Sequence, residues 1–356
     1  MTRGRLALFL LMVISPVVAA AQKSDGPGGG EKVPLESVVA GLEARRAAFP
    51  KEGRLAYTHY LVRVEQEGYA QFKSLVTGRL EDEGELRREL QRLLESPLAV
   101  RLDANRGTLW FRHGRYRLVR TSLLEDFAPD VVSRLEEQAA KTGARLRLPA
   151  KEIETLQDDS IDCQAELVDG KMLYVQPRVS RIAPVLPELD ITMHRWQDAI
   201  DIGPARGQTI TATSLPSGDH VIEFSTRRED GSFSGGARYI FASRRFSSPE
   251  SVTVYERDRV SKEILYADRS SSLEGPRWPV VTMHAEFLGD TGRVDIALWV
   301  VEEMAAEAVP DRQLRLCPSE RFHIVDQTRG KDRIIDPPAE RKEFDLQFLH
   351  QLVQSE

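Results

Sequence analysis

The side chains that most often carry chemistry are scattered along this chain. Its histidines stand at positions 59, 113, 194, 220, 284, 323 and 350. No two of them have the one-, three- or four-residue gaps that place two metal ligands on one face of a strand or helix. No Gly-x-Ser-x-Gly occurs either, since Phe233 takes the nucleophile's place in Gly231–Gly235, a composition typical of a hairpin tip. The sequence predicts no metal centre, no cofactor and no identifiable catalytic residue.

The acidic residues leave an enzymatic alternative open. Asp158, Asp159, Asp162 and Asp169 cluster, but they lack the alternating oxygen ligands and central glycine of a calcium loop, so a solvated loop is the better interpretation. Glycoside hydrolysis needs only two carboxyl groups at a suitable distance in space. An envelope hydrolase with an unrecognised acidic or histidine-containing site is therefore a second hypothesis.

Cys163 and Cys317 are the two cysteines of the chain and form a candidate disulfide pair. In an exported protein two cysteines permit one bridge, which would close a long loop. The alternative is two buried free thiols on strands, because a chain of this size does not need a covalent staple. The sequence favours the free thiols slightly.

The N-terminal residues have the pattern of a secretory signal peptide over residues 1–21. A basic start at Arg3 and Arg5 precedes an apolar run from Leu6 to Ser15, and small residues follow up to Ala21. The apolar run is too short to span a bilayer comfortably, so we expect cleavage near Ala21 or Gln22, a periplasmic or otherwise exported protein, and no transmembrane segment in the mature chain. Residues 22–34 are glycine-rich and predict a flexible linker.

Composition narrows the class of partner. The 356 residues carry 49 Lys+Arg against 55 Asp+Glu, a net charge of −6, which argues against general attraction to nucleic acid or to anionic lipid headgroups. A local basic patch is compatible with that balance. The 41% hydrophobic content suffices for a folded core in a chain of this length.

Short amphipathic helices are predicted at four places. Apolar residues recur at helical spacing from Leu35 to Phe49, from Leu86 to Leu94, from Pro129 to Thr142 and from Phe344 to Leu352. None has an apolar stripe wide enough to form a bundle with the others. These helices must therefore pack on something else.

The rest of the chain is dominated by strand patterns. Strands are predicted at Arg54–Glu65 and, after a turn, at Gln71–Leu80; strands then recur with turn signals every 8 to 15 residues as far as Val301. Val281, Met283, Ala285 and Phe287 alternate with polar residues, which indicates one dry and one wet face. The predicted fold class is β-rich α+β: a curved antiparallel sheet forming an incompletely closed barrel, with short helices as plug or lid.

The second half of the chain resembles the outer-membrane lipoprotein carrier (LolA/LolB-like) superfamily. The resemblance lies in the order of a β-meander followed by four short motifs: Ser248-Pro249-Glu250, Arg277-Trp278-Pro279, Val309-Pro310-Asp311 and Phe322-His323-Ile324-Val325-Asp326-Gln327. It covers about Arg54 to Arg329 and implies a half-open barrel with helices as a lid over an apolar cavity for acyl chains. The implied domain spans 35–330, with 331–356 as a C-terminal linker and amphipathic helix.

The chain departs from that pattern in its greater length and in additional segments at Gly84–Pro97 and Arg312–Pro318. No cargo-contacting residue is carried over from the family. From the strand patterns alone, Trp110, Phe224, Met283 and Phe287 are the candidate apolar residues lining a cavity, because each is large and stands on a strand whose neighbours alternate polar. The alternative is that they fill a solid core.

Three functions are consistent with these observations. The first is an exported, non-enzymatic envelope carrier or sensor that binds lipid or the acyl chains of a lipoprotein in an apolar cavity. The second is the envelope hydrolase, and the third is a structural or interaction module with a filled core, whose partners would be other envelope proteins. The sequence modestly favours the first.

Overall fold

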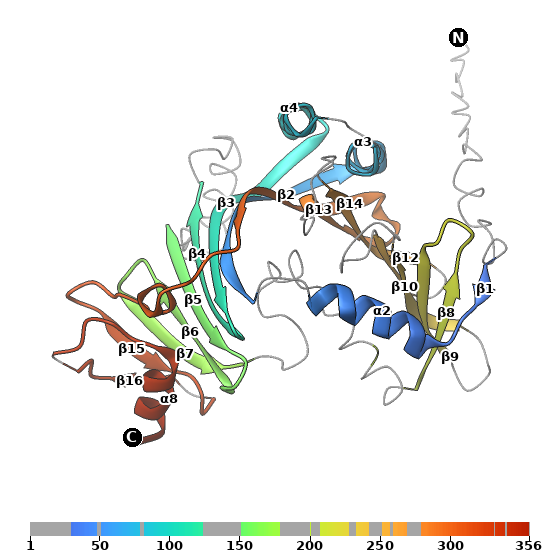
Figure 1. Ribbon diagram of the computed structural model, residues 1–356. Coiled ribbons are helices and arrows are strands. Elements are labelled where there is room, and N and C mark those ends of the chain that lie inside the picture. Colours follow the sequence, from blue (N-terminus) through green and yellow to red (C-terminus); the bar gives the residue numbers. More distant parts are fainter. Residues whose placement is uncertain are drawn as a thin grey trace, which may run out of the picture.

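The computed structural model describes residues 30–47, 51–78, 82–123, 151–178, 200, 207–227, 233–241, 251–256, 259–268, 279–330, 332–338 and 340–355. Its strands form a single sheet that curves into an arch (Figure 1). The order across the sheet is β1-β8-β9-β10-β11-β12-β13-β14-β2-β3-β4-β5-β6-β7-β15-β16. The order begins at β1 and ends at β16, and no pairing among the described residues joins these two edge strands. The sheet is therefore open.

The strands in chain order are β1 (Glu31–Lys32), β2 (Glu52–Glu65), β3 (Ala99–Arg112), β4 (Arg115–Ser122), β5 (Glu152–Asp158), β6 (Cys163–Val168), β7 (Met172–Pro177), β8 (Gln208–Ser214), β9 (His220–Arg227), β10 (Phe233–Phe241), β11 (Ser251–Glu256), β12 (Arg259–Asp268), β13 (Pro279–Phe287), β14 (Arg293–Ala305), β15 (His323–Asp326) and β16 (Arg333–Ile335). The helices are α2 (Leu35–Ala47), α3 (Gln66–Thr77), α4 (Glu83–Leu94) and α8 (Leu346–Ser355), with short 3-10 turns η3 (Gly289–Thr291) and η4 (Asp311–Leu314).

Neighbouring strands are antiparallel except at one end, where β15 runs parallel to β7. The centre of the sheet is a long-range pairing: β14 pairs with β2 from Arg293 opposite Glu65 to Ala305 opposite Arg54. This pairing joins the meander β2–β7 to the meander β8–β14. The tight turns are of the kind that hairpins need, since His113-Gly114 and Asp169-Gly170 both have positive φ.

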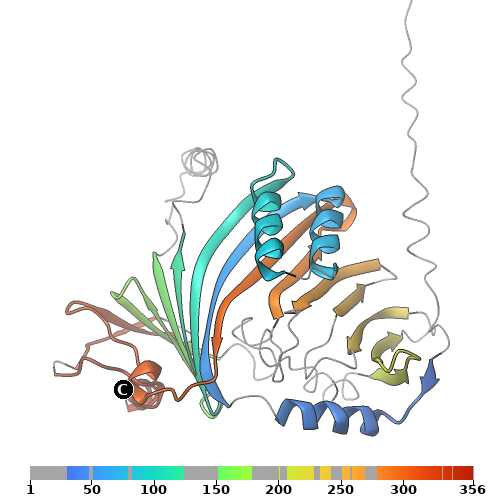
Figure 2. The ribbon, with the colours of Figure 1, turned by 45° about the horizontal axis from the view of Figure 1, so that its top comes forward.

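Helices α3 and α4 cover the outer face of the arch side by side (Figures 1 and 2). Their buried residues, among them Phe72 and Leu90, pack on alternate residues of β12, β13, β14 and β2 to form one large core cluster. Charged contacts fix α3 in place, because Lys73 Nζ lies 2.9 Å from Glu263 Oε1 on β12 and the Tyr69 hydroxyl donates to the same carboxylate. Asp82 caps α4 by accepting from the Gly84 amide at 2.9 Å.

Helix α8 packs on the same face near the other end of the sheet. Phe344, Leu346, Leu349 and Val353 form a second core cluster with residues of β5, β6, β7, β15 and β16. Alternation along the strands places this cluster on the outer face. The predicted C-terminal helical stripe is confirmed as α8.

Helix α2 packs on the opposite, inner face, inside the hollow of the arch (Figure 2). Its Val38 is buried against Ala212, Ile222, Phe224 and Phe241. The predicted curved antiparallel sheet that does not close into a barrel is therefore confirmed; of the helices predicted as plug or lid, α2 lies on the inner face, whereas α4 lies on the outer face.

Two parts of the secondary-structure prediction are wrong. Gln71–Leu80 is not a strand, because α3 occupies residues 66–77 and buries Tyr69, Phe72 and Val76 on one side at helical spacing. The predicted wet face of β13 is also wrong in part: Thr282 and His284 are buried as well as Met283, whereas Glu286 on the same face is exposed. Strand β5 was not predicted.

Several predicted segments fall outside the described residues. These are the signal peptide at 1–21, most of the linker at 22–34 and the helix at 129–142. Within the linker range, Glu31–Lys32 pair with β8. In the described part of the chain, no helix combines the length and apolar character that crossing a membrane requires.

Candidate binding site on the inner face

A row of polar and aromatic side chains crosses the inner face at the centre of the sheet. The registers of six adjacent strands, β12, β13, β14, β2, β3 and β4, place one residue of each strand in the same line. At the usual strand spacing this line is about 24 Å long. We call it the polar row; it consists of Tyr266, Thr282, Trp299, His59, Asn105 and Ser122.

Aromatic contacts organise the middle of the row. The Trp299 ring lies between two imidazoles, with centroid distances of 4.7 Å to His59 and 4.6 Å to His284. His284 stands on β13, two residues along from Thr282 on the same face. The rings are tilted against one another, at 41° and 57°, with Trp299 and His284 buried and His59 half-buried.

His59 is held in its neutral form. Burial, with a smaller contribution from the positive charge of Arg120, lowers its pKa from 6.5 to about 4. The His59 Nδ1 atom lies 3.1 Å from Asn105 Nδ2, so the amide donates to this nitrogen and the ring carries its proton on Nε2. His59 is thus a fixed hydrogen-bonding group at neutral pH and not a charge.

Arg120 stands beside the row on the same face, two residues from Ser122 along β4. It pairs with Gly107 on β3, which in turn pairs with Tyr57 on β2. A Cβ at Gly107 would lie 2.0 Å from the Tyr57 ring, so glycine is required for Tyr57 to lie across β3 towards β4. Among the described residues, no carboxylate forms an ion pair with Arg120.

Apolar surfaces flank the row on both sides along the inner face. On one side lies the cluster that contains Leu55, Tyr57, Leu109 and Leu118. On the other side lie Val252 and Ile264, followed by the cluster under α2. The hollow of the sheet is therefore amphipathic, with a polar centre between apolar walls.

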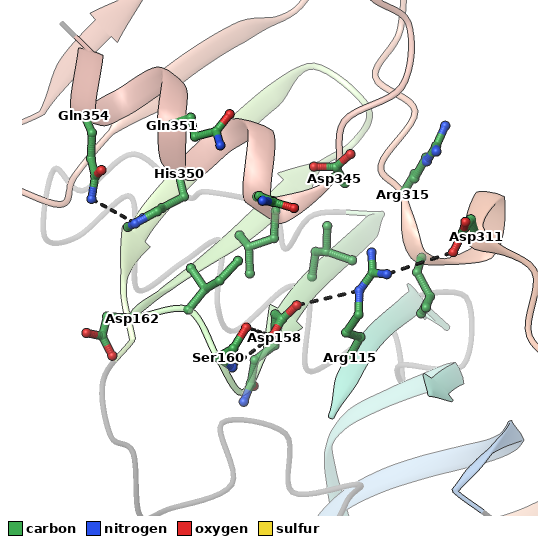
Figure 3. Close-up of a pocket in the computed structure, with 16 residues that line it drawn as sticks. Arg115, Asp158, Ser160, Asp162, Asp311, Arg315, Asp345, His350, Gln351 and Gln354 are labelled. Atoms are coloured by element: carbon green, nitrogen blue, oxygen red, sulfur yellow. Dashed lines mark hydrogen bonds and ion pairs between the residues drawn. The ribbon is translucent and has the colours of Figure 1, made fainter. Parts of the chain in front are cut away.

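A second, more polar hollow of about 980 Å³ lies between α8, η4 and the ends of β4 and β5 (Figure 3). Arg115 is held there by two carboxylates, at 3.6 Å from Asp158 and 3.9 Å from Asp311. Asp158 also accepts from the amide and hydroxyl of Ser160 at 2.9 and 2.6 Å. Arg115 and its two carboxylates therefore already neutralise one another within this hollow.

Beneath that hollow, Cys163 and His350 are neighbours, with Sγ 3.5 Å from Nδ1. This is a pairing of the type that serves nucleophilic catalysis, but burial raises the pKa of the Cys163 thiol to about 11. The thiol is therefore protonated at neutral pH. Cys163 and Cys317 are both free, one buried and one exposed, so the candidate disulfide is not formed in the structure.

The four candidate cavity residues do not meet in one cavity. Met283 and Phe287 belong to the outer-face core, Met283 fully buried and Phe287 against Tyr69 at 5.1 Å between ring centroids. Phe224 lies under α2 on the inner face. Trp110 is half-buried on the outer face, where the Arg117 guanidinium stands 5.4 Å from its ring.

Sequence reasoning did not find the polar row. Its members come from distant parts of the chain, and each stands alone in its own strand. Two local features of the sequence hinted at it. Thr282 and His284 are polar residues inside an otherwise apolar strand, and Trp299 is a large aromatic residue on the face of β14 opposite to its regular apolar residues. Only the strand registers bring them together.

The fold defines a class of protein: an open, curved antiparallel sheet with helices on both faces. A scan against protein-family models and a search of curated proteins gave no match. The solved structures that are similar to the chain include the two described next.

One is an outer membrane lipoprotein-sorting protein domain from Vibrio parahaemolyticus, with 11% identity, a TM-score of 0.36, and coverage of 75% of this chain and 92% of that one. The other is a LolA superfamily protein from Nitrosomonas europaea, with 12% identity, a TM-score of 0.37, and coverage of 79% and 97%. At these identities and TM-scores, the function of the present chain must be argued from its own side chains.

Proposed function

We propose that this protein is an exported, non-enzymatic carrier or sensor that binds an amphiphilic molecule, a lipid or an acylated protein, in the hollow between α2 and the inner face of the sheet. The observation that supports this most directly is the amphipathic inner face, with apolar walls on both sides of a polar centre. A face of this composition suits a ligand that has both a polar and an apolar part.

Helix α2 is the element that would cover the apolar part of the ligand. Within the described residues of α2, Val38 is the one buried side chain, while Leu35 and Val39 are half-buried. A helix held by so few apolar contacts opens at low cost in free energy, which a lid needs in order to load and release cargo.

The export part of the proposal rests on the basic, apolar and small-residue segments of residues 1–21. An exported carrier would act where an acyl chain must cross water, which the chain avoids by about 0.8 kcal/mol per methylene. The intact mass of the protein recovered from cells tests export, with a mature start near Ala21 or Gln22 expected. Full-length chain in the membrane fraction would contradict it.

Ligand binding is tested by extracting the purified protein with organic solvent and identifying the extract by mass spectrometry. A fluorescent fatty acid is then titrated into the delipidated protein. We expect a co-purified amphiphile and saturable binding of the probe. A protein that carries no lipid and binds no probe would instead be a structural or interaction module.

Two matched variants test the role of α2. Val38→Ala removes the buried anchor of α2, whereas Val76→Ala removes an equally buried valine of α3 on the outer face. Both should lower the free energy of unfolding by about 1 to 3 kcal/mol. Only Val38→Ala should accelerate release of the fluorescent fatty acid; equal release rates in both variants would exclude α2 as the lid.

A further inference from the structure

We propose that the polar row, together with Arg120, binds an oxyanion, the carboxylate or phosphate headgroup of the amphiphile, and so selects acidic ligands over neutral and cationic ones. This inference rests on the proposed function, because it assigns the headgroup of the ligand whose apolar part lies in the hollow.

The inner face has polar atoms whose hydrogen-bonding capacity is not used within the protein. Thr282 Oγ1, Trp299 Nε1, Asn105 Oδ1, Ser122 Oγ and Arg120 Nε are buried atoms without a hydrogen-bond partner. Thr282 and Trp299 are 0% and 5% exposed, so water does not reach them freely. Buried polar groups in folded proteins are nearly always paired, and several unpaired groups in one line indicate a site for a polar ligand.

The charge around these atoms favours an anionic ligand. Arg120 supplies the formal positive charge, because His59 is neutral at physiological pH. Trp299 Nε1 and Ser122 Oγ add an N–H and an O–H donor on either side of it, whereas Thr282 lies on β13, too far along the row to contact the same headgroup, and Asn105 Oδ1 is an acceptor. The acidic residue on this face of β3, Asp103, lies two residues beyond Asn105 on the side away from Arg120. Donors and an unneutralised guanidinium match an oxyanion, which accepts hydrogen bonds and carries negative charge.

Apolar residues next to the polar row would receive the alkyl chain of the ligand. The residue line adjacent to the polar row, on the side away from Arg120, contains Ile222, Tyr239, Val252 and Ile264. This line leads from the centre of the sheet to the cluster under α2. A headgroup at Arg120 and Trp299 would therefore direct an alkyl chain along apolar residues towards α2.

The test uses four amphiphiles with one chain length: dodecanoate, dodecyl phosphate, dodecanol and dodecyltrimethylammonium. Each is titrated into delipidated protein below its micelle concentration, with isothermal calorimetry as the readout. Dodecanoate and dodecyl phosphate should bind on the order of tenfold to a hundredfold more tightly than the other two, as expected for a charged hydrogen bond in a desolvated site. The comparison of the two anions distinguishes a carboxylate site from a phosphate site.

Three variants locate the effect. Arg120→Gln should remove the preference for anions, while Arg120→Lys should restore part of it because the charge is kept. Arg106→Gln is the matched control, since Arg106 is an exposed arginine on the opposite face of β3 and should leave all four affinities unchanged. Circular dichroism and urea unfolding verify that each variant is folded.

The outcomes separate this inference from the proposed function. If all four amphiphiles bind equally and Arg120→Gln changes nothing, the hollow binds apolar chains but the oxyanion site is refuted. If the anions bind and Arg120→Gln and Arg106→Gln weaken them equally, the attraction is a general surface effect and the site is again refuted. If none binds, the proposed function itself fails.

Discussion

His59 makes the stability of the protein depend on pH in a defined direction. Its pKa is about 4 in the folded chain and 6.5 when unperturbed, so below pH 6.5 the unfolded chain takes up a proton that the folded chain does not. The free energy of unfolding therefore falls as the pH is lowered from about 6.5 to about 4. The total loss from His59 is on the order of 3 kcal/mol, and below about pH 4 its contribution no longer changes.

Urea unfolding of the wild type and of His59→Gln, from about pH 7 to about pH 4, checks this prediction. Carboxylates throughout the protein also titrate in this range, and Arg120 opposes the charging of His59, so the informative quantity is the difference between the two proteins. His59→Gln should show the shallower dependence on pH. Identical slopes would mean that His59 is not buried as a neutral ring.

Met283 is predicted to act in stability and not in binding. Its side chain is fully buried in the core under α3 and α4, on the face opposite to the hollow. Met283→Ala should lower the free energy of unfolding by about 2 to 5 kcal/mol through the lost contacts and the cavity left behind. Binding of the fluorescent fatty acid by the folded variant should be unchanged; weaker binding at unchanged stability would reinstate Met283 as a cavity residue.

At the scale of elements, α8 is expected to hold the far end of the sheet together. Strands β15 and β16 are short, and their apolar residues Ile324 and Ile335 are buried in the same cluster as Leu349 of α8. Leu349→Ala should therefore loosen both strands, because short edge strands have little stability of their own.

Amide hydrogen exchange measures this directly. In Leu349→Ala the amides of β15, β16 and α8 should exchange faster, while those of β13, β14 and β2 should keep their protection. Uniform acceleration across the whole sheet would show that α8 stabilises the entire fold and not one end of it.

At the scale of the molecule, we expect one cooperative unfolding transition. The sheet is continuous from β1 to β16, and its two meanders share the long pairing of β14 with β2. Tryptophan fluorescence and far-ultraviolet circular dichroism should give coincident urea curves. Two separate transitions, or a stable proteolytic fragment ending near Asp158, would show that the two meanders fold independently.

The part of the fold that follows from local patterns could be predicted. Alternation along 281–287 and 293–301, with turn residues between the strands, is enough to predict β13 and β14, because a strand's side chains have a period of two. The same patterns, with the absence of long helices between strands, indicate an antiparallel sheet. The mistaken strand at 71–80 arose because a short segment with Tyr69, Phe72 and Val76 fits either period until its packing partner is known.

The spacing of the histidines and cysteines in the sequence also determined that no motif groups them into a local site. Only the tertiary structure decided which ones meet. The registers of six strands place Trp299 beside His59 and bring Arg120 next to their row, and a shift of one residue in any pairing would turn these side chains to the outer face. Register depends on the whole sheet, so the polar row has no local signature in the chain.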